Sequence, residues 1–130
     1  MRGGVELVTI DKLRAHEQVC PQRLRVVKAE ISRSDKINNP VIVDRKTKII
    51  LDGHHRVESL KQLGCQLIPA MMVDYFSDQV RVFSRRKNIK ISKKTVVARA
   101  LKKQIFPQKT TKHLIKNRIR GVKIKLNQLK

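Results

Sequence analysis

The clearest structural signal in the sequence lies at residues 48–56, which read Lys-Ile-Ile-Leu-Asp-Gly-His-His-Arg. Its apolar first part predicts a buried strand, and apolar residues at helical spacing between 57 and 63 predict that a helix follows Gly53. The first N–H groups of a helix have no partner within the helix and lie at the positive end of its dipole, so they bind phosphate readily. Glycine at the junction permits a positive φ angle or a close backbone approach. The sequence therefore predicts an anion site at a strand–turn–helix junction.

The side chains around this junction suit a phosphate site. Arg56 can place a planar guanidinium fork against phosphate oxygens. His54 and His55 can donate hydrogen bonds, or carry charge if their pKa values are raised. Asp52 is a poor phosphate contact by itself, but it can hold Mg²⁺ or orient a histidine. The alternative is a turn whose histidines are surface polar groups, and a metal site made by the two histidines alone is not expected, because neighbours on a helix diverge by about 100°.

Outward from the junction, apolar patterns predict a mixture of strands and helices. The expected strands cover residues 5–10, 41–43, 48–51 and 67–73, with a short extended piece at 80–83, and the expected helices cover residues 21–33, 54–63 and 93–104. Pro69 indicates that its strand begins at a sheet edge, whereas residues 114–130 fit a helix, a strand or a tail. We expect a compact α+β domain at residues 1–113, with a small mixed sheet and packed helices, and a basic C-terminal extension at 114–130.

The charge of the chain is strongly positive and uneven. The 130 residues carry a formal net charge of +21, and the part from Gln79 to Lys130 holds 18 basic and no acidic side chains. A field of one sign attracts phosphates and polyanions, so nucleic acid is a candidate partner of the basic C-terminal half. Three Phe and one Tyr give few stacking platforms, which argues weakly against binding of single strands.

Further features of the composition favour a cytoplasmic protein. No run of residues approaches the roughly 18 apolar residues of a membrane span, and the first residues lack the apolar stretch of a signal peptide. Cys20 and Cys65 have no partner at metal-ligand or redox spacing, which is typical of buried thiols in a reducing compartment. We therefore expect no membrane partner.

The segment at residues 52–64, Asp-Gly-His-His-Arg-Val-Glu-Ser-Leu-Lys-Gln-Leu-Gly, resembles the nucleotide-binding segment of the ParB/sulfiredoxin superfamily. Within it, the chain is most similar to the archaeal free serine kinases, in a short form. The similarity includes Ala15-His16-Glu17 upstream, residues 41–73, and the segment from Phe106 to His113 downstream, in the family's order. The resemblance implies a kinase that transfers the terminal phosphoryl group of ATP or ADP, with Mg²⁺, to free L-serine and gives O-phospho-L-serine.

The resemblance also implies roles for individual residues. Glu17 matches the catalytic carboxylate, which accepts the proton of the serine hydroxyl as that oxygen attacks the phosphoryl group. The motif that holds the nucleotide phosphates and Mg²⁺ is matched by Asp52, Gly53, His54, His55 and Arg56, with Asp52 as the metal ligand. The loop that binds serine and phosphoserine is matched by Lys109, Thr110, Thr111 and His113.

Two alternatives stand beside the kinase. A ParB-like DNA-binding or nuclease-type module fits the basic C-terminal half, but no clear helix-turn-helix follows the nucleotide motif, and residues 54–56 replace the Arg-rich box of partition proteins. A sulfiredoxin needs a Cys beside the His-Arg pair, and His54 occupies that place. The known serine kinases tend to carry a Trp where the closest residue here is Phe83, and their chemistry does not account for the basic end at 112–130.

Overall fold

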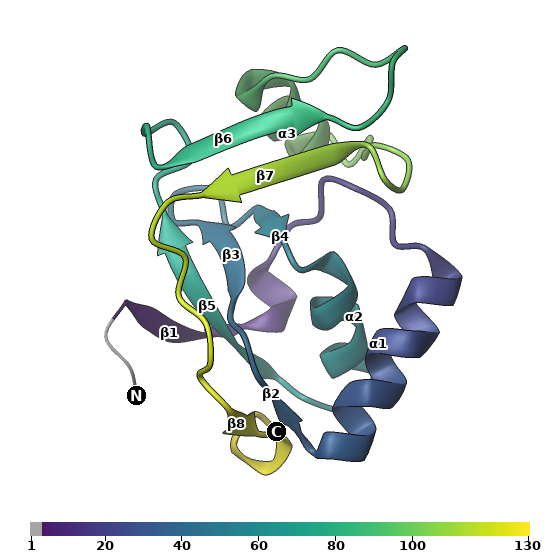
Figure 1. Ribbon diagram of the computed structural model, residues 1–130, viewed down its shortest axis with the longest axis vertical. Helices are drawn as coiled ribbons and strands as arrows, with labels where there is room; N and C mark the ends of the chain where they lie inside the picture. Colours follow the sequence, from purple (N-terminus) through teal and green to yellow (C-terminus); the bar gives the residue numbers. More distant parts are fainter. Residues whose placement is uncertain (1–3) are drawn as a thin grey trace.

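A computed structural model describes residues 4–130 of the chain. Figure 1 shows a central sheet, helices α1 and α2 beside it, and a two-stranded ribbon that lies apart from the sheet with α3 behind it. The helices are α1 (Pro21–Ser34), α2 (His54–Gln62) and α3 (Lys93–Leu101), and the strands are β1 (Val5–Thr9), β2 (Lys36–Ile37), β3 (Val41–Asp44), β4 (Ile50–Asp52), β5 (Leu67–Val73), β6 (Val80–Ser84), β7 (Thr111–Ile115) and β8 (Ile124–Lys125). Within the described residues, no helix has the length and apolar character needed to cross a membrane.

The central sheet has four strands in the order β1-β5-β3-β4. β5 runs antiparallel to β1 and parallel to β3, and β3 forms an antiparallel hairpin with β4. Val41, Ile42 and Val43 of β3 have no exposed surface, which explains why this strand reads as a continuous apolar run. The predicted α+β class with a small mixed sheet is confirmed.

The edge position predicted for Pro69 is wrong. Pro69 pairs with Leu7 of β1, and β5 is an inner strand of the sheet. A proline is accommodated there because the ladder between β5 and β3 begins only at the next residue, with the pair Val41 and Ala70. The missing N–H of the proline therefore falls at the start of that ladder.

Helices α1 and α2 share the main hydrophobic core with the sheet. α1 begins with Pro21 in its first turn, where a missing N–H leaves no helical hydrogen bond unmade. Val27 and Ile31 of α1 pack in one cluster with Leu60 of α2 and with side chains of β3 and β5. Burial of each such side chain contributes about 1.5–3 kcal/mol, so this core fixes the start of α2 against the end of β4.

A second hydrophobic cluster joins α3 and the ribbon of β6 and β7 to the opposite face of the sheet. It includes Tyr75, Val80 and Val96, which are buried. α3 starts as predicted after Ser92, whose side chain accepts the N–H of Thr95 in a capping box. This second cluster places β7 beside β4, where the predicted site lies.

The C-terminal segment at residues 114–130 is built into the fold. Its first residues complete β7, and β8 pairs antiparallel with β2. Leu126 and Leu129 are buried in the main core, and the C=O of Leu129 accepts hydrogen bonds from the N–H groups of Gln66 and Leu67 at 2.8 and 2.9 Å. The predicted boundary after His113 thus falls inside β7.

Candidate active site

A cavity of about 980 Å³ lies between α1, the start of α2 and β7. Its walls carry eight basic and three acidic side chains, so it attracts anions. The predicted residues that line it are Glu17, Asp52, Gly53, His54, His55, Arg56, Thr111 and His113. Lys109 and Thr110 are outside its lining, but their backbone contacts Glu17. Three distant parts of the sequence therefore meet at one cavity.

Gly53 makes the sharp turn between β4 and α2. Its φ is 111° and its ψ is 23°, a left-handed conformation that side chains disfavour. Its C=O accepts the first helical hydrogen bond, from the N–H of Val57 at 3.0 Å. The first turn of α2 contains no acidic residue, so nothing there competes with an anion for the free amides.

The carboxylate of Glu17 is held by the loop that precedes β7. Its Oε1 accepts the N–H of Thr110 at 3.2 Å and both the N–H and the hydroxyl of Thr111 at 2.8 Å, and its Oε2 accepts the N–H of Lys109 at 3.2 Å. Backbone hydrogen bonds between residues 16–18 and Phe106 align the two segments. The Glu17 segment and the predicted serine loop are therefore one rigid unit.

His54 and His55 face the segment that carries Glu17. Nε2 of His54 accepts the N–H of His16 at 3.2 Å, and Nε2 of His55 accepts the N–H of Cys20 at 2.9 Å. A backbone N–H can only donate, so both Nε2 atoms are unprotonated. Burial lowers the pKa of both rings, and the pKa of His54 falls well below its ordinary value. The raised pKa that would give these histidines a charge is absent, and they support the Glu17 segment as neutral rings.

Two more histidines are buried behind the cavity wall. Nδ1 of His16 lies 2.7 Å from the C=O of Ile50, and its Nε2 lies 2.8 Å from the hydroxyl of Thr111. Nε2 of His113 lies 2.8 Å from the hydroxyl of Tyr75. Burial lowers the pKa of His16, lowers the pKa of His113 to about 3, and raises the pKa of Tyr75. These neutral groups position Thr111 and β7 without adding charge.

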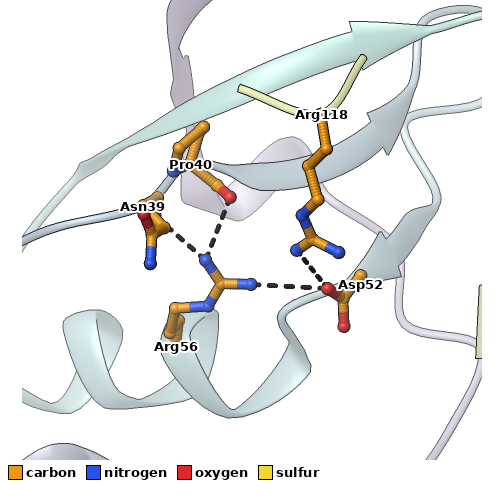
Figure 2. A network of polar contacts seen from close by, with 5 residues as sticks. All are labelled: Asn39, Pro40, Asp52, Arg56 and Arg118. Carbon is orange, nitrogen blue, oxygen red and sulfur yellow. Dashed lines mark hydrogen bonds and ion pairs between the residues drawn. The ribbon is translucent and has the colours of Figure 1, made fainter. Parts of the chain in front are cut away.

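Asp52 is engaged by two arginines, as Figure 2 shows. Its Oδ2 accepts a hydrogen bond from Nη2 of Arg118 and lies 3.7 Å from Nη2 of Arg56. Nη1 of Arg56 also donates to the C=O groups of Asn39 and Pro40, at 3.0 and 2.9 Å. Burial alone would raise the pKa of Asp52, but the two guanidinium groups outweigh it and the pKa is lowered. The carboxylate is therefore ionised at neutral pH.

This arrangement offers a Mg²⁺ ion few ligands from the protein. Mg²⁺ demands octahedral oxygen ligands, usually one or two carboxylates with phosphates and water. Between residues 4 and 130, no group of three His, Cys, Asp or Glu side chains is placed to hold a metal ion. The one predicted ligand, Asp52, already neutralises two guanidinium groups.

Comparisons with known proteins match the chain to curated relatives and to solved structures. A ParB-like protein of Sulfolobus acidocaldarius is 45% identical over 80 residues, which cover 60% of this chain and 39% of that protein. An ATP-dependent L-serine kinase of Staphylothermus marinus is 35% identical over 80 residues, which cover 58% of this chain and 32% of that protein. The chain thus matches less than half the length of these relatives. No protein-family model matches it.

The structural match covers nearly the whole chain. A free serine kinase solved in complex with AMP superposes with a TM-score of 0.87 at 15% identity, over 98% of this chain and 94% of that one. The chain has the free serine kinase fold. The resemblance inferred from the motifs at residues 15–17, 52–64 and 106–113 is confirmed at this level.

Sequence reasoning missed several residues of the site in this free serine kinase fold. Arg118 lies in a run of basic residues, so nothing in the pattern singles it out. Tyr75 and Asn39 act through contacts with residues far away in the chain. His16 carried a usable signal, because it stands next to Glu17 in the matched motif, but its buried position depends on tertiary packing.

Proposed function

We propose that this chain is a free L-serine kinase, which transfers the terminal phosphoryl group of ATP or ADP to the serine hydroxyl and gives O-phospho-L-serine. One observation carries the proposal: the Glu17 carboxylate lines the same cavity as the phosphate-binding junction at residues 52–56. Support comes from the fold of a free serine kinase bound to AMP and from a relative named as an ATP-dependent L-serine kinase.

Glu17 is the proposed base. As the serine oxygen forms a bond to the terminal phosphorus, the bond from phosphorus to the bridging oxygen of the nucleotide breaks, and the hydroxyl proton moves to the Glu17 carboxylate. Oε2 has a single long hydrogen bond, at 3.2 Å, so it retains acceptor capacity toward the cavity. Four hydrogen-bond donors hold this carboxylate in one position, so the side chain of Glu17 is already oriented before the substrates bind.

The neighbours of Glu17 offer its proton a second position. The hydroxyl of Thr111 has one hydrogen but two neighbouring acceptors, Oε1 of Glu17 and Nε2 of His16. The ring of His16 donates through Nδ1, because the C=O of Ile50 can only accept. When the proton taken up at Oε2 exchanges through solvent in the cavity to Oε1, Oε1 donates to the hydroxyl of Thr111, whose own hydrogen then points to Nε2 of His16. The protonated state therefore satisfies both contacts.

The remaining predicted residues divide between the two substrates. The first amides of α2 and the guanidinium group of Arg56 supply hydrogen-bond donors for the nucleotide phosphates. The loop at residues 109–113 supplies the proposed serine site through Lys109, Thr110, Thr111 and His113. Any Mg²⁺ that enters with the nucleotide would take its ligands mainly from phosphate and water.

A direct assay tests this function. Protein incubated with L-serine and either ATP or ADP, in buffer containing MgCl₂, should yield phosphoserine that is detected by ³¹P NMR or mass spectrometry. Glu17→Gln, which keeps the shape of the side chain but removes the base, should lower the rate at least about 100-fold, as expected for loss of a general base. Nucleotide binding should stay within about threefold, because Glu17 does not hold the phosphates.

The matched control is Glu58→Gln on α2, whose side chain bonds Gln62 and lies outside the cavity lining. This variant should keep the wild-type rate. Absence of phosphoserine with both nucleotides, or an active Glu17→Gln variant, would refute the proposed reaction or the proposed base, respectively.

A second candidate function, binding of duplex DNA, is favoured by the outer face of the ribbon. Arg81 pairs with Leu114, and Phe83 pairs with Lys112, across β6 and β7, and all four side chains are exposed. The guanidinium of Arg81 lies 5.1 Å from the centre of the Phe83 ring. A two-stranded ribbon with a basic outer face fits the width of a DNA major groove. Lys112 and Leu114 of this face also line the cavity, whereas Arg81 and Phe83 lie outside its lining.

Two further expectations stay predictions, the cytoplasmic location and a requirement for Mg²⁺. The division expected after residue 113 falls inside β7, so we assign the proposed site to the fold as a whole.

A further inference from the structure

The C-terminal segment delivers an arginine into the predicted phosphate site. Arg118 follows β7 and lines the cavity together with Asp52 and Arg56. Only 16% of its side-chain surface is exposed, against 21% for Arg56. Figure 2 shows the two guanidinium groups converging on one carboxylate from different parts of the chain. Arg118 is thus as deeply placed in the site as the arginine of the nucleotide motif.

The contacts of Arg118 leave part of its hydrogen-bonding capacity unused. Its hydrogen bond and ion pair to Asp52 both go through Nη2. Its Nε is buried and has no hydrogen-bond partner among the described residues. Because Nε has almost no accessible surface, the donors left for a ligand in the cavity are those of the terminal Nη1 and Nη2 atoms. A guanidinium group offers five N–H donors in a planar fork, which matches the geometry of a phosphate group.

The backbone on both sides of Arg118 is fixed, so the guanidinium is pre-organised. On one side, β7 pairs with β6. On the other, the N–H of Gly121 donates to Oδ1 of Asn39 at 2.9 Å, and the N–H of Val122 donates to the C=O of Asn38 at 2.7 Å. Asn39 also accepts the hydrogen bond of Arg56. One short segment therefore anchors both arginines of the site.

We propose that Arg118 binds the phosphates of the nucleotide together with Arg56, and that Asp52 positions this pair of guanidinium groups instead of holding a metal ion. Asp52 contacts both groups through one oxygen atom, Oδ2, which sets their relative position. Two fixed guanidinium groups at the start of α2 supply the positive charge that a terminal phosphoryl group requires. The inference rests on the proposed function only in that a nucleotide occupies the cavity.

Calorimetric titration with ADP and with adenosine, in EDTA and at fixed salt, tests the role of Arg118 without any reaction. Arg118→Ala should weaken ADP binding at least about tenfold, the size expected for a lost charge-assisted pair of hydrogen bonds. Adenosine binding should change less than about twofold, because adenosine has no phosphate. Arg118→Lys, which keeps the charge but loses the fork, should fall between the two.

Lys116→Ala is the matched control, since it removes one positive charge from the same segment at an exposed residue outside the cavity lining. It should change ADP affinity less than about threefold, as expected for a distant screened charge. Melting temperatures of all variants show whether each one folds, and Arg118→Lys carries the test if Arg118→Ala does not fold. An equal loss for ADP and adenosine, or no loss for either, overturns the inference.

Variants made in the Asp52→Asn background distinguish direct phosphate binding by Arg118 from neutralisation of the Asp52 carboxylate. If Arg118 contacts phosphate, Arg118→Ala still weakens ADP binding at least about fivefold when Asp52→Asn is also present. If the double variant binds ADP as Asp52→Asn does, Arg118 only compensates the carboxylate and the inference fails. The positioning role of Asp52 fails separately if Asp52→Asn weakens ADP binding in MgCl₂ but not in EDTA, because that result identifies a metal ligand. These binding results stand whether or not phosphoserine is formed.

Discussion

Gly53 meets two requirements that other residues of the site do not face. Its φ of 111° lies in the left-handed region, where a side chain costs roughly 1–2 kcal/mol. In addition, a Cβ atom at this position would lie 2.9 Å from Cβ of Val41 and 3.0 Å from Nη2 of Arg56. Val41 belongs to the fully buried β3, so a side chain at position 53 would press against a neighbour that is already packed.

Gly53→Ala should therefore lower the free energy of unfolding by about 3 kcal/mol or more, through strain and overpacking together. Gly64→Ala is the control, because Gly64 also has a positive φ, 84°, but an added Cβ meets nothing within 4 Å. It should cost only about 1 kcal/mol. Urea unfolding measures both values, and equal losses would show that the packing against Val41 is looser than the structure has it.

At the scale of elements, the four histidines join α2, β7 and the loop before α1. His54 and His55 bond the backbone of residues 16 and 20, and His16 contacts Thr111 of β7. All four rings have a lowered pKa, chiefly because burial disfavours the charged form. The hydrogen bonds that connect these elements therefore require the imidazole rings to be neutral.

This dependence predicts that stability falls in mild acid. His113 has a pKa of about 3 in the folded protein, against roughly 6.5 in an unfolded chain. Below pH 6.5 the unfolded state therefore binds a proton at this residue, and the folded state does not. Its stabilising contribution is complete above pH 6.5 and decreases as the pH falls toward 3. Between pH 7 and 5 the decrease amounts to up to about 2 kcal/mol for this group.

Urea unfolding at pH 7, 6 and 5 measures the effect, and His113→Gln should make the decrease smaller. If the unfolding free energies of the wild type at pH 7 and pH 5 are the same, the buried histidines are already protonated in the fold, or solvent reaches them.

The sequence predicted the elements whose patterns are local. The hairpin of β3 and β4, the junction at Gly53 and the cap of α3 at Ser92 each depend on residues that are neighbours in the chain. The predictions failed where the structure depends on which strands pair. Pro69 is tolerated inside the sheet because the ladder between β5 and β3 starts one residue later. Residues 114–130 showed no clear period, because their shape comes from pairing with β2 and from burial of Leu129. The position of Arg118 in the site depends on the same tertiary packing, so the sequence did not predict it.

At the scale of the whole molecule, the charge is divided between two uses. The cavity uses part of it, with eight basic residues in its walls. Of the rest, Arg81, Arg86, Lys87 and Lys90 lie on β6 and in the loop after it, and no acidic residue occurs from Gln79 onward. Figure 1 places this ribbon at one end of the molecule, away from β8 and the C-terminal end. An excess of this size on one exposed end predicts attraction to polyanions.

Binding of duplex DNA should therefore weaken steeply with salt, with a slope of log affinity against log salt of about −0.9 for each phosphate neutralised. The double variant Arg81→Gln and Lys87→Gln should lower affinity and reduce this slope by about two, while phosphoserine formation stays unchanged. Lys28→Gln and Lys61→Gln, on α1 and α2, form the matched control.

Fluorescence anisotropy with a labelled duplex at several salt concentrations measures these affinities. Equal losses in both double variants would mean that the attraction is diffuse, and that the ribbon is no defined interface.

The hydrogen bonds to the Glu17 carboxylate determine which substitutions the loop at residues 109–111 can accept. Three of its four donors are backbone N–H groups, and any residue except proline provides one. The exposed side chain at position 109 can therefore change while the carboxylate stays in place, whereas Thr110 is buried and its hydroxyl donates to the C=O of Pro107. Only Thr111 contributes through its hydroxyl as well. Substitutions at position 109 can therefore change the chemistry at the edge of the cavity without moving the carboxylate of Glu17.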